Sequence, residues 1–524
     1  MERESYAGKA RGVHLPVAAR QLRSDPMRNG LLGAIVVLTA GASLAWGQYP
    51  PPPGPSYPGG PSTIPPPVAI PGGTGGYEGQ PNYPPPANWE GIDPNGPPRD
   101  MGASSVVPRW WMGAEYLMFF AKSSAFNIPI ATTSSPGSAG VLGNADTRIL
   151  YGNSDIPYNF GSGFRVFGGW YFDDSNRYGI EISGFNQGKQ SRTFTLDSAT
   201  FDSPVIAQPF VNAITGAQSS LVVATPGFST GVLSAVTSTQ IWGVEANGLM
   251  NIFRTAPGGS FGYNLNFLLG FRFAMVTEDI QLSSTSTLLN NGATATINNQ
   301  TFAGGFTTNR VNTISGTGAV TTVVTDSQST VQQKILDQFH TRNEFYGGNL
   351  GMTQDFRFGR FTLGMTAKLG LGDMHQIVDI HGLSNVVVGS DNTVTTRITD
   401  PNGVPISNTA TTTHVDVNHV AVGGLYAQSN LVGRYQTNTF AVLPDLGFTF
   451  ACQITPHIST YFGYNFLYFS QVVRPFNLIN GTVNTALQPT SPNFGAATVV
   501  RPINLFPNSD FSVQTIRIGL NIAY

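Results

Sequence analysis

The chain has 524 residues and a formal net charge of −2, and only 11 % of its residues are charged, where a typical soluble domain has about 25 %. The hydrophobic fraction is only 40 %, so Thr, Asn, Ser and 61 glycines, rather than core-forming residues, take the place of the missing charges. This mixture is typical of strands, turns and uncharged loops. The charge balance gives no reason to expect nucleic acid as a partner, and the single cysteine, Cys452, excludes an intramolecular disulfide framework.

Residues 1–47 have the pattern of a secretory signal peptide. Arg28 precedes an apolar run over residues 31–44, and Ala45 and Gly47 supply small residues at the two positions that a signal peptidase reads. The run is too short and wrongly flanked for a stable membrane span. We expect cleavage near Gly47, with Met27 as an alternative translation start.

Residues 48–108 are expected to form a disordered Pro/Gly-rich periplasmic linker. Of the 37 prolines in the chain, 18 lie between residues 48 and 100. Proline removes backbone donors and glycine raises the entropic cost of ordering, so a polyproline-like or disordered segment is favoured over a packed one.

Ten β-strands are expected in the remainder, residues 109–524. Their apolar residues recur with period two, as over 361–371, where Phe, Leu, Met and Ala alternate with Thr, Gly and Lys. The expected strands are 109–121, 161–172, 178–186, 238–253, 261–279, 336–356, 361–379, 435–454, 458–473 and 511–524. Short connections of a few residues alternate with long ones, which cover about 122–160, 187–237, 280–335, 380–434 and 474–510. This rhythm is typical of outer-membrane barrels, in which short turns face the periplasm and long loops face outside.

The two faces of these strands differ in charge. The more apolar faces carry almost none, whereas the opposite faces carry isolated charges of both signs, which a polar lumen accommodates. The expected lumen-facing charges are Glu115, Arg165, Glu181, Glu245, Arg272, Glu344, Lys368, Asp445 and Arg517.

The predicted fold class is therefore all-β: a closed antiparallel transmembrane β-barrel of ten strands, or up to fourteen if segments such as 191–197 and 293–298 add strands. A sheet in lipid must close on itself to pair its backbone groups. A soluble β-sandwich is the rival, but its outer face would carry many charges. It would also not need apolar faces that end in Trp and Tyr, such as Trp110, Tyr116 and Tyr464.

Several sequence pieces, taken in order, resemble the beta-barrel porin family of planctomycete bacteria. They include Trp110–Leu117 (WWMGAEYL), Trp242–Asn247 (WGVEAN), Thr341–Gly348 (TRNEFYGG) and Gly463–Tyr468 (GYNFLY). The resemblance covers about 109–524 and implies an outer-membrane barrel, but it supplies no catalytic residues.

No enzyme motif accompanies the strands. The sequence has no Gly-x-Ser-x-Gly elbow and no phosphate-binding loop. His414 and Asp416 share one face of an extended segment, but we interpret them as loop residues, because a metal site needs three or four converging ligands. We therefore expect no catalytic, cofactor-binding or metal site, and no enzymatic activity.

Two functions remain open for an integral protein of the outer membrane. The first is a porin-like channel for ions or small solutes. The alternative is a structural or surface-display barrel with an occluded lumen, whose long loops carry binding or adhesion. Fewer than twelve strands and an interior filled by side chains would favour the alternative, because barrel diameter grows with strand number. The expected partners are the lipid bilayer and the export and barrel-assembly machinery, and a homo-oligomer is left open.

Overall fold

The computed structural model describes residues 108–524, except 159, 202–203, 256–260, 290–291 and 497–503. The predicted signal peptide and the predicted linker up to residue 107 lie outside the described residues.

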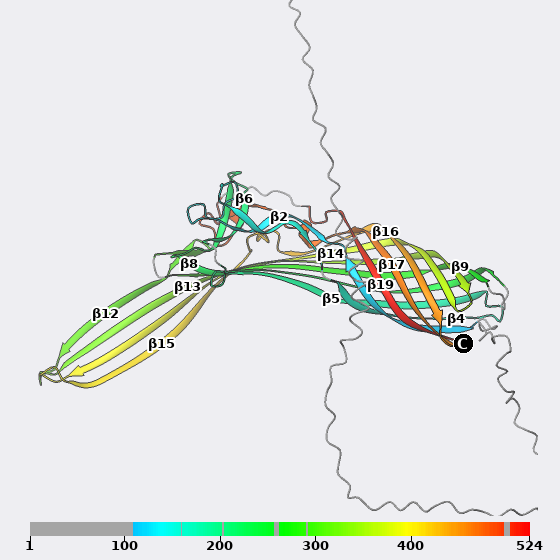
Figure 1. Ribbon diagram of the computed structural model, residues 1–524. Coiled ribbons are helices and arrows are strands. Elements are labelled where there is room, and N and C mark those ends of the chain that lie inside the picture. Colours follow the sequence, from blue (N-terminus) through cyan, green and yellow to red (C-terminus); the bar gives the residue numbers. More distant parts are fainter. Residues whose placement is uncertain (1–107, 159, 202–203, 256–260, 290–291, 497–503) are drawn as a thin grey trace, which may run out of the picture. The chain divides into compact units, whose positions relative to one another are not determined.

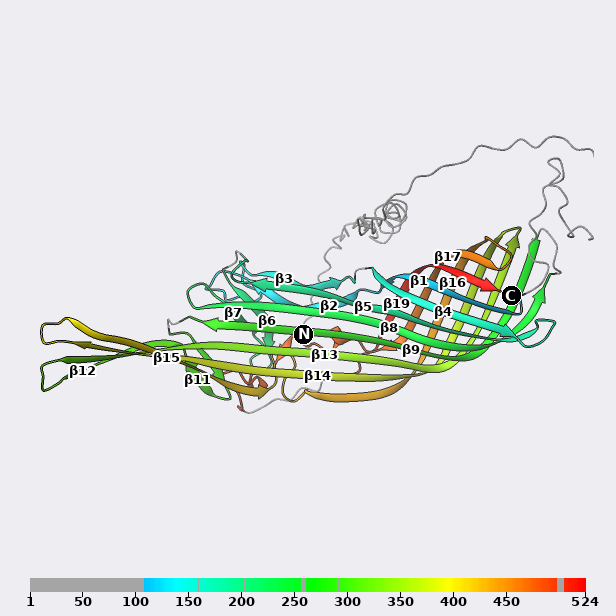
Figure 2. The ribbon, with the colours of Figure 1, turned by 90° about the horizontal axis from the view of Figure 1, so that it is seen from below.

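Ten long strands form a ring of antiparallel pairs (Figures 1 and 2). In chain order they are β1 (Trp110–Ala121), β4 (Gly161–Tyr171), β5 (Tyr178–Asp197), β8 (Ser229–Arg254), β9 (Phe261–Leu288), β13 (Val320–Phe358), β14 (Phe361–Thr399), β16 (Gly433–Gln453), β17 (Ile458–Val472) and β19 (Ser509–Ala523). Each pairs with the next in this list, and β19 pairs with β1. The predicted all-β fold class is confirmed, and each expected strand corresponds to one strand of the ring.

The first and last strands of the ring, β1 and β19, pair with each other and complete it. Trp111 lies opposite Ala523 in the pairing of β1 with β19. The Trp110 amide donates to the Tyr524 carbonyl over 2.8 Å, and the two rings stack with centroids 5.1 Å apart. Because the first and last strands pair, neither presents an unpaired edge to lipid.

The alternation of short and long connections is present as predicted. Short turns link β4 to β5, β8 to β9, β13 to β14 and β16 to β17. The long connections, however, are not all loops. They contain β2 (Ser124–Thr133), β3 (Arg148–Ile156), β6 (Ile206–Asn212), β7 (Gln218–Ala224) and β18 (Thr482–Val483), which form a five-stranded sheet, and the hairpin of β10 (Thr294–Ile297) with β11 (Gln300–Ala303).

Two more strands in the long connections extend the ring strands outward. β12 (Gly305–Ile314) pairs with β13, and β15 (Pro405–Val422) pairs with β14. We call the four-stranded sheet made by β12, residues 320–329 of β13, residues 390–399 of β14 and β15 the arm; it lies at the end of the ring that carries the long connections (Figure 1). His414 therefore lies in a strand, not in a loop as the sequence suggested.

The two segments considered as additional barrel strands do not widen the ring. Residues 191–197 continue β5, and the segment 293–298 contains β10, which pairs only with β11. In the described part of the chain, no helix has the length and apolarity needed to cross a membrane.

Large apolar side chains cover the outside of the ring at the short-turn end. Phe164, Leu369, Phe450 and Leu520 are all more than one third exposed and alternate with inward residues. Such an apolar outer band is what a barrel in a bilayer requires.

Candidate functional site: the charged vestibule and the apolar layer

Eight of the nine predicted lumen charges line one cavity inside the ring, here called the vestibule. Its volume is about 500 Å³. The charges come from eight strands: Glu115 (β1), Arg165 (β4), Glu181 (β5), Glu245 (β8), Arg272 (β9), Lys368 (β14), Asp445 (β16) and Arg517 (β19). Strand alternation explains the convergence, because residues of one phase on every strand of a ring point to the same interior.

Glu344 is the exception and requires a correction. Its neighbour Phe345 is fully buried, so Glu344 belongs to the opposite phase, together with the exposed Tyr346. On that side its carboxylate accepts a hydrogen bond from the Tyr346 hydroxyl at 2.9 Å and forms an ion pair with Arg342, whose Nε lies 2.8 Å from Glu344 Oε1. The sequence pattern did not reveal this phase, because both phases of this segment contain polar and aromatic residues.

Register pairs acids with bases across neighbouring strands. Glu115 lies opposite Arg165, Glu245 opposite Arg272, and Lys368 opposite Asp445. Glu245 is the most connected group: its oxygens lie 2.6 Å from Arg272 Nη2, 2.5 Å from Lys368 Nζ and 3.8 Å from Arg165 Nη2. The buried carboxylate thus has cations on several sides, which an isolated buried charge would lack.

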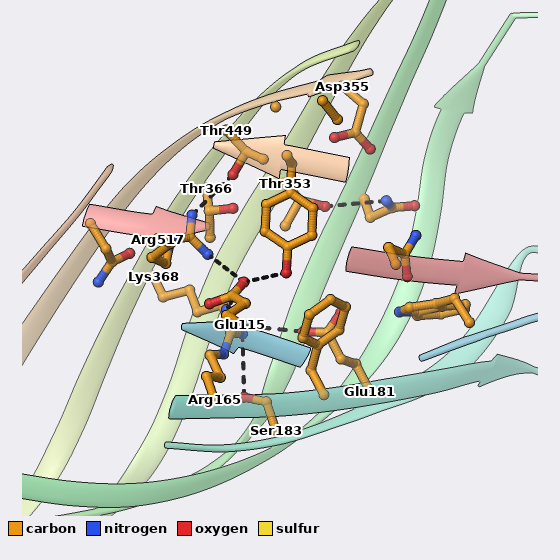
Figure 3. Close-up of a pocket in the computed structure, with 18 of the residues that line it drawn as sticks. Glu115, Arg165, Glu181, Ser183, Thr353, Asp355, Thr366, Lys368, Thr449 and Arg517 are labelled. Atoms are coloured by element: carbon orange, nitrogen blue, oxygen red, sulfur yellow. Dashed lines mark hydrogen bonds and ion pairs between the residues drawn. The ribbon is translucent and has the colours of Figure 1, made fainter. Parts of the chain in front are cut away.

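A second centre lies around Glu115, which Figure 3 shows together with Arg517 and Arg165, its two ion-pair partners. Arg517 Nη1 donates to Glu115 Oε1 over 3.2 Å, and the Tyr461 hydroxyl donates to the same oxygen over 2.9 Å. Tyr461 was not singled out from the sequence. It lies in the phase opposite to the apolar face that includes Phe462 and Tyr464, but it carries no charge, and only charges marked the predicted lumen.

The vestibule reaches the short-turn end of the ring. Its lining there includes Pro108, Thr255, Arg357 and Asn521. The topology predicts that this end faces the periplasm, so we expect the vestibule to open to the periplasm.

Toward the other end, the lumen is filled by side chains that we call the apolar layer. They come from eight ring strands and their immediate ends, and they are buried to 8 % exposure or less: Phe119, Ile241, Ala274, Val276, Phe345, Met374, Ala441, Leu443, Leu467, Phe469, Val472, Phe511 and Val513. Most share the inward phase of the vestibule charges, as Phe119 does with Glu115 on β1 and Met374 with Lys368 on β14. Since Phe119, Phe345, Phe469 and Phe511 are 0 % exposed, no water-filled path runs between these four side chains.

Beyond the apolar layer, chain segments from the long connections fold into a second hydrophobic core. Leu425, Ala427 and Phe476 are buried there with Phe339 and Ile380 of the ring strands. This core forms a second buried layer, made of inserted segments as well as ring strands.

Polar anchors hold these folded-in segments. Asp337 of β13 accepts hydrogen bonds from the amides of Tyr426 and Ala427 at 2.9 and 2.7 Å. The Asn343 side chain makes two bonds with the Val473 backbone, at 2.9 and 2.8 Å. Both anchors satisfy backbone groups that burial would otherwise leave unpaired.

A buried ion pair adds a further anchor. Arg474 contacts both carboxylate oxygens of Glu278, at 2.7 and 2.9 Å, and donates to the Ser123 carbonyl at 2.9 Å. Glu278 was identifiable in principle, since it continues the inward phase of Arg272 on β9. Arg474 was not, because it lies outside any strand and no periodicity marks it.

The comparisons with known proteins identify the family. The family model described as "Putative beta barrel porin-7 (BBP7)" matches residues 111–312 and 305–524. The chain belongs to this family. The predicted porin family is thus confirmed, and the protein is an integral β-barrel of the outer membrane with a porin-like architecture.

Other comparisons add little on activity. No curated protein matches the chain. Among solved structures, it is similar to the outer membrane protease OmpT from Escherichia coli, with 7 % identity, TM-score 0.30 and coverage of 79 % of this chain and 96 % of that chain. It is also similar to a Pseudomonas aeruginosa FadL homologue (8 %, TM-score 0.22, 81 % and 96 %) and to the P. putida toluene transporter TodX (6 %, TM-score 0.18, 81 % and 94 %). Membership of this family supports a porin-like barrel, and the absence of catalytic activity stays a prediction.

Proposed function

We propose that this porin-family member is an outer-membrane barrel whose lumen is closed at rest and whose extracellular structure is its working surface. The apolar layer is the observation that carries this proposal, because its four phenylalanines are wholly buried inside a ring of only ten strands. About eight strands leave an interior that side chains can fill, whereas 16–18 leave an aqueous channel. Fewer than twelve strands and an interior filled by side chains are the two conditions under which the sequence analysis favoured a display barrel over an open pore.

A gated channel for ions or small solutes is the second candidate. The vestibule supports it: about 500 Å³ of space lined by charges of both signs would admit water and small polar solutes from the short-turn end. Conduction would then require the apolar layer and the folded-in segments to move aside together.

Thiol labelling distinguishes the two candidates. In a Cys452→Ser background, Thr366→Cys places a thiol in the vestibule, and Asn312→Cys places one on the exposed arm. We expect a small charged thiosulfonate, added to intact cells of a porin-deficient host, to label Asn312→Cys but not Thr366→Cys. Cell lysis should make Thr366→Cys reactive as well.

Planar bilayer recordings of the purified chain give an independent measurement. A closed lumen predicts no discrete conductance steps at any voltage. If Thr366→Cys is labelled from outside and stepwise conductance is recorded, the closed-barrel proposal is wrong and the gated channel is the better proposal.

A further inference from the structure

The arm has one charged face and one uncharged face. Residues directly opposite one another form rows across its four strands, such as Val311, Val323, Thr396 and Thr409. Five such rows take every second residue from 305–313, 321–329, 390–398 and 407–415, and all twenty residues are Gly, Ser, Thr, Asn, Val or Ile. We call this the uncharged face. The residues between them form the other face, which carries Arg310, Asp326, Asp391, Arg397, His414 and Asp416.

Neither face is buried along the arm. Val311 is 53 % exposed and Val394 37 % exposed, and no residue of 305–314, 320–329 or 405–418 is buried. A side of a sheet that carries no charge can pack against another layer without burying an unpaired charge, and along the described arm this face has no such layer.

At its base, the same face already has such a layer. The β10–β11 hairpin packs there: Ala295 and Ile297 are buried together with Val331 and Val386, which lie in the phase of the uncharged face. Phe302 of the hairpin lies against His419, with ring centroids 4.4 Å apart. The exposed rows are therefore the continuation of a surface that accepts a second β layer.

We propose that the uncharged face of the arm pairs with the same face of a second copy of this chain. Membrane insertion gives all copies the same orientation, so a two-fold axis along the membrane normal can relate two copies whose identical arm faces are in contact. The uncharged faces can meet without burying a charge, whereas pairing the opposite faces would bury Arg310, Asp326 and Arg397. An isologous contact thus suits one face of the arm and not the other.

The size of the face fits such a contact. Four strands spaced about 4.8 Å apart, with nine residues at about 3.3 Å each, cover roughly 600 Å² of flat area. Specific interfaces bury about 800 Å² of accessible surface per partner, and a face with protruding side chains has more accessible surface than flat area. The proposal does not depend on whether the lumen conducts, since conduction concerns the ring and pairing concerns the arm.

Neighbouring valines of the arm provide the test. Val323 lies on the uncharged face and Val324, the next residue of β13, on the charged face. We expect Val323→Lys to reduce the dimer fraction of the full chain in lipid vesicles roughly tenfold or more, because two like charges would face each other. Val324→Lys is the matched control and should dimerise like the unchanged chain.

Cysteine crosslinking fixes the geometry. In a Cys452→Ser background, Thr396→Cys should crosslink to a second copy through a bis-maleimide of about 10 Å, the distance between packed sheets, and Thr395→Cys should not. The proposal is overturned if both cysteines crosslink equally, if neither does at any protein density, or if Thr396→Cys links only to a different surface molecule. Secondary structure by circular dichroism checks that each variant is folded.

Discussion

Glu245 shows how the barrel tolerates charges in its interior. Three cations and the Asn349 amide, at 3.2 Å, surround its carboxylate. Desolvating these ions is expensive, and their mutual contacts offset that cost only while the set is complete. The cluster is therefore a condition for the fold of this sequence, whatever the vestibule binds.

Replacing this carboxylate tests that dependence. We expect Glu245→Gln to lower the free energy of unfolding by about 3–5 kcal/mol, because it leaves Lys368 and Arg272 short of a buried counter-charge. Urea unfolding in lipid vesicles measures the change. The control is Glu344→Gln on the outer side of β13, which should cost less, because Glu344 has one cation, Arg342, whose side chain is 39 % exposed; equal losses would contradict the assignment of the two phases.

Whether a given residue faces the lumen or the outside could be predicted from the sequence for only part of this site. The charges of the vestibule were predictable, because a charge in an otherwise apolar strand favours the lumen. The apolar layer was not, because Phe119 and Phe120 are neighbours of the same type, one 0 % and the other 38 % exposed. An aromatic side chain is compatible both with lipid contact and with a lumen filled by side chains. Only the pairing of the strands shows which of the two neighbouring phenylalanines points inward.

Among the elements, β13 and β14 depart furthest from the sequence expectation. Each has 39 residues, whereas the pattern indicated only 336–356 and 361–379. The missing parts carry Thr, Val, Ser and Asn without strict alternation. Alternation arises when one face is apolar and the other wet, and in the arm both faces are exposed. The residue types in the arm segments still favour strands, but the alternation of apolar and polar residues that would have revealed these strands is missing.

Cohesion of β14 with β15 is expected to depend on pH through His414. Its Nδ1 lies 2.5 Å from Asp391 Oδ1 and its Nε2 3.3 Å from Asp416 Oδ1. The hydrogen bond to Asp391 and then that to Asp416 raise the pKa of His414 above its usual 6.5. A raised histidine pKa gives stability that is fully present below the unfolded pKa and is lost as pH rises through the folded pKa.

We therefore expect amides of β14 and β15 in the arm to be better protected near about pH 6 than near about pH 8.5, after correction for intrinsic exchange rates. Hydrogen exchange with mass spectrometry measures the difference. In His414→Gln the difference should disappear, and its persistence would show that another group causes it.

At the scale of the whole molecule, ring size, strand order and the alternation of connections were all predictable. In lipid every backbone group must be paired, so membrane strands have to form a closed ring. Once the strands are recognised by their period-two pattern, their number and order follow. The second core was not predictable, because Leu425 and Phe476 lie in segments whose burial depends on contacts with distant strands. The two buried layers therefore differ in origin: the apolar layer belongs to the ring strands, and the second core belongs largely to inserted segments.

Arg474 links that second core to the ring. Arg474→Met removes the partner of the buried Glu278 and should cost about 3–5 kcal/mol, chiefly by opening the segment around 473–483. We expect faster proteolysis of this segment from outside the cell. Conductance should stay absent, because the apolar layer below remains. Arg434→Met is the control, since Arg434 lies 3.8 Å from Asp379 and its side chain is 59 % exposed; equal proteolysis of both variants would contradict the anchor.

The pairing of β1 with β19 has a consequence for biogenesis. Trp111 and Ala523 meet at a separation of almost the entire barrel sequence, and contacts so remote form late and slowly. Until the final strand is present, one edge of β1 has unpaired N–H and C=O groups, which can pair with the wrong strand or with another chain. Pairing around the ring is complete only when the last strand is available, so we expect the new polypeptide to need protection from aggregation until then.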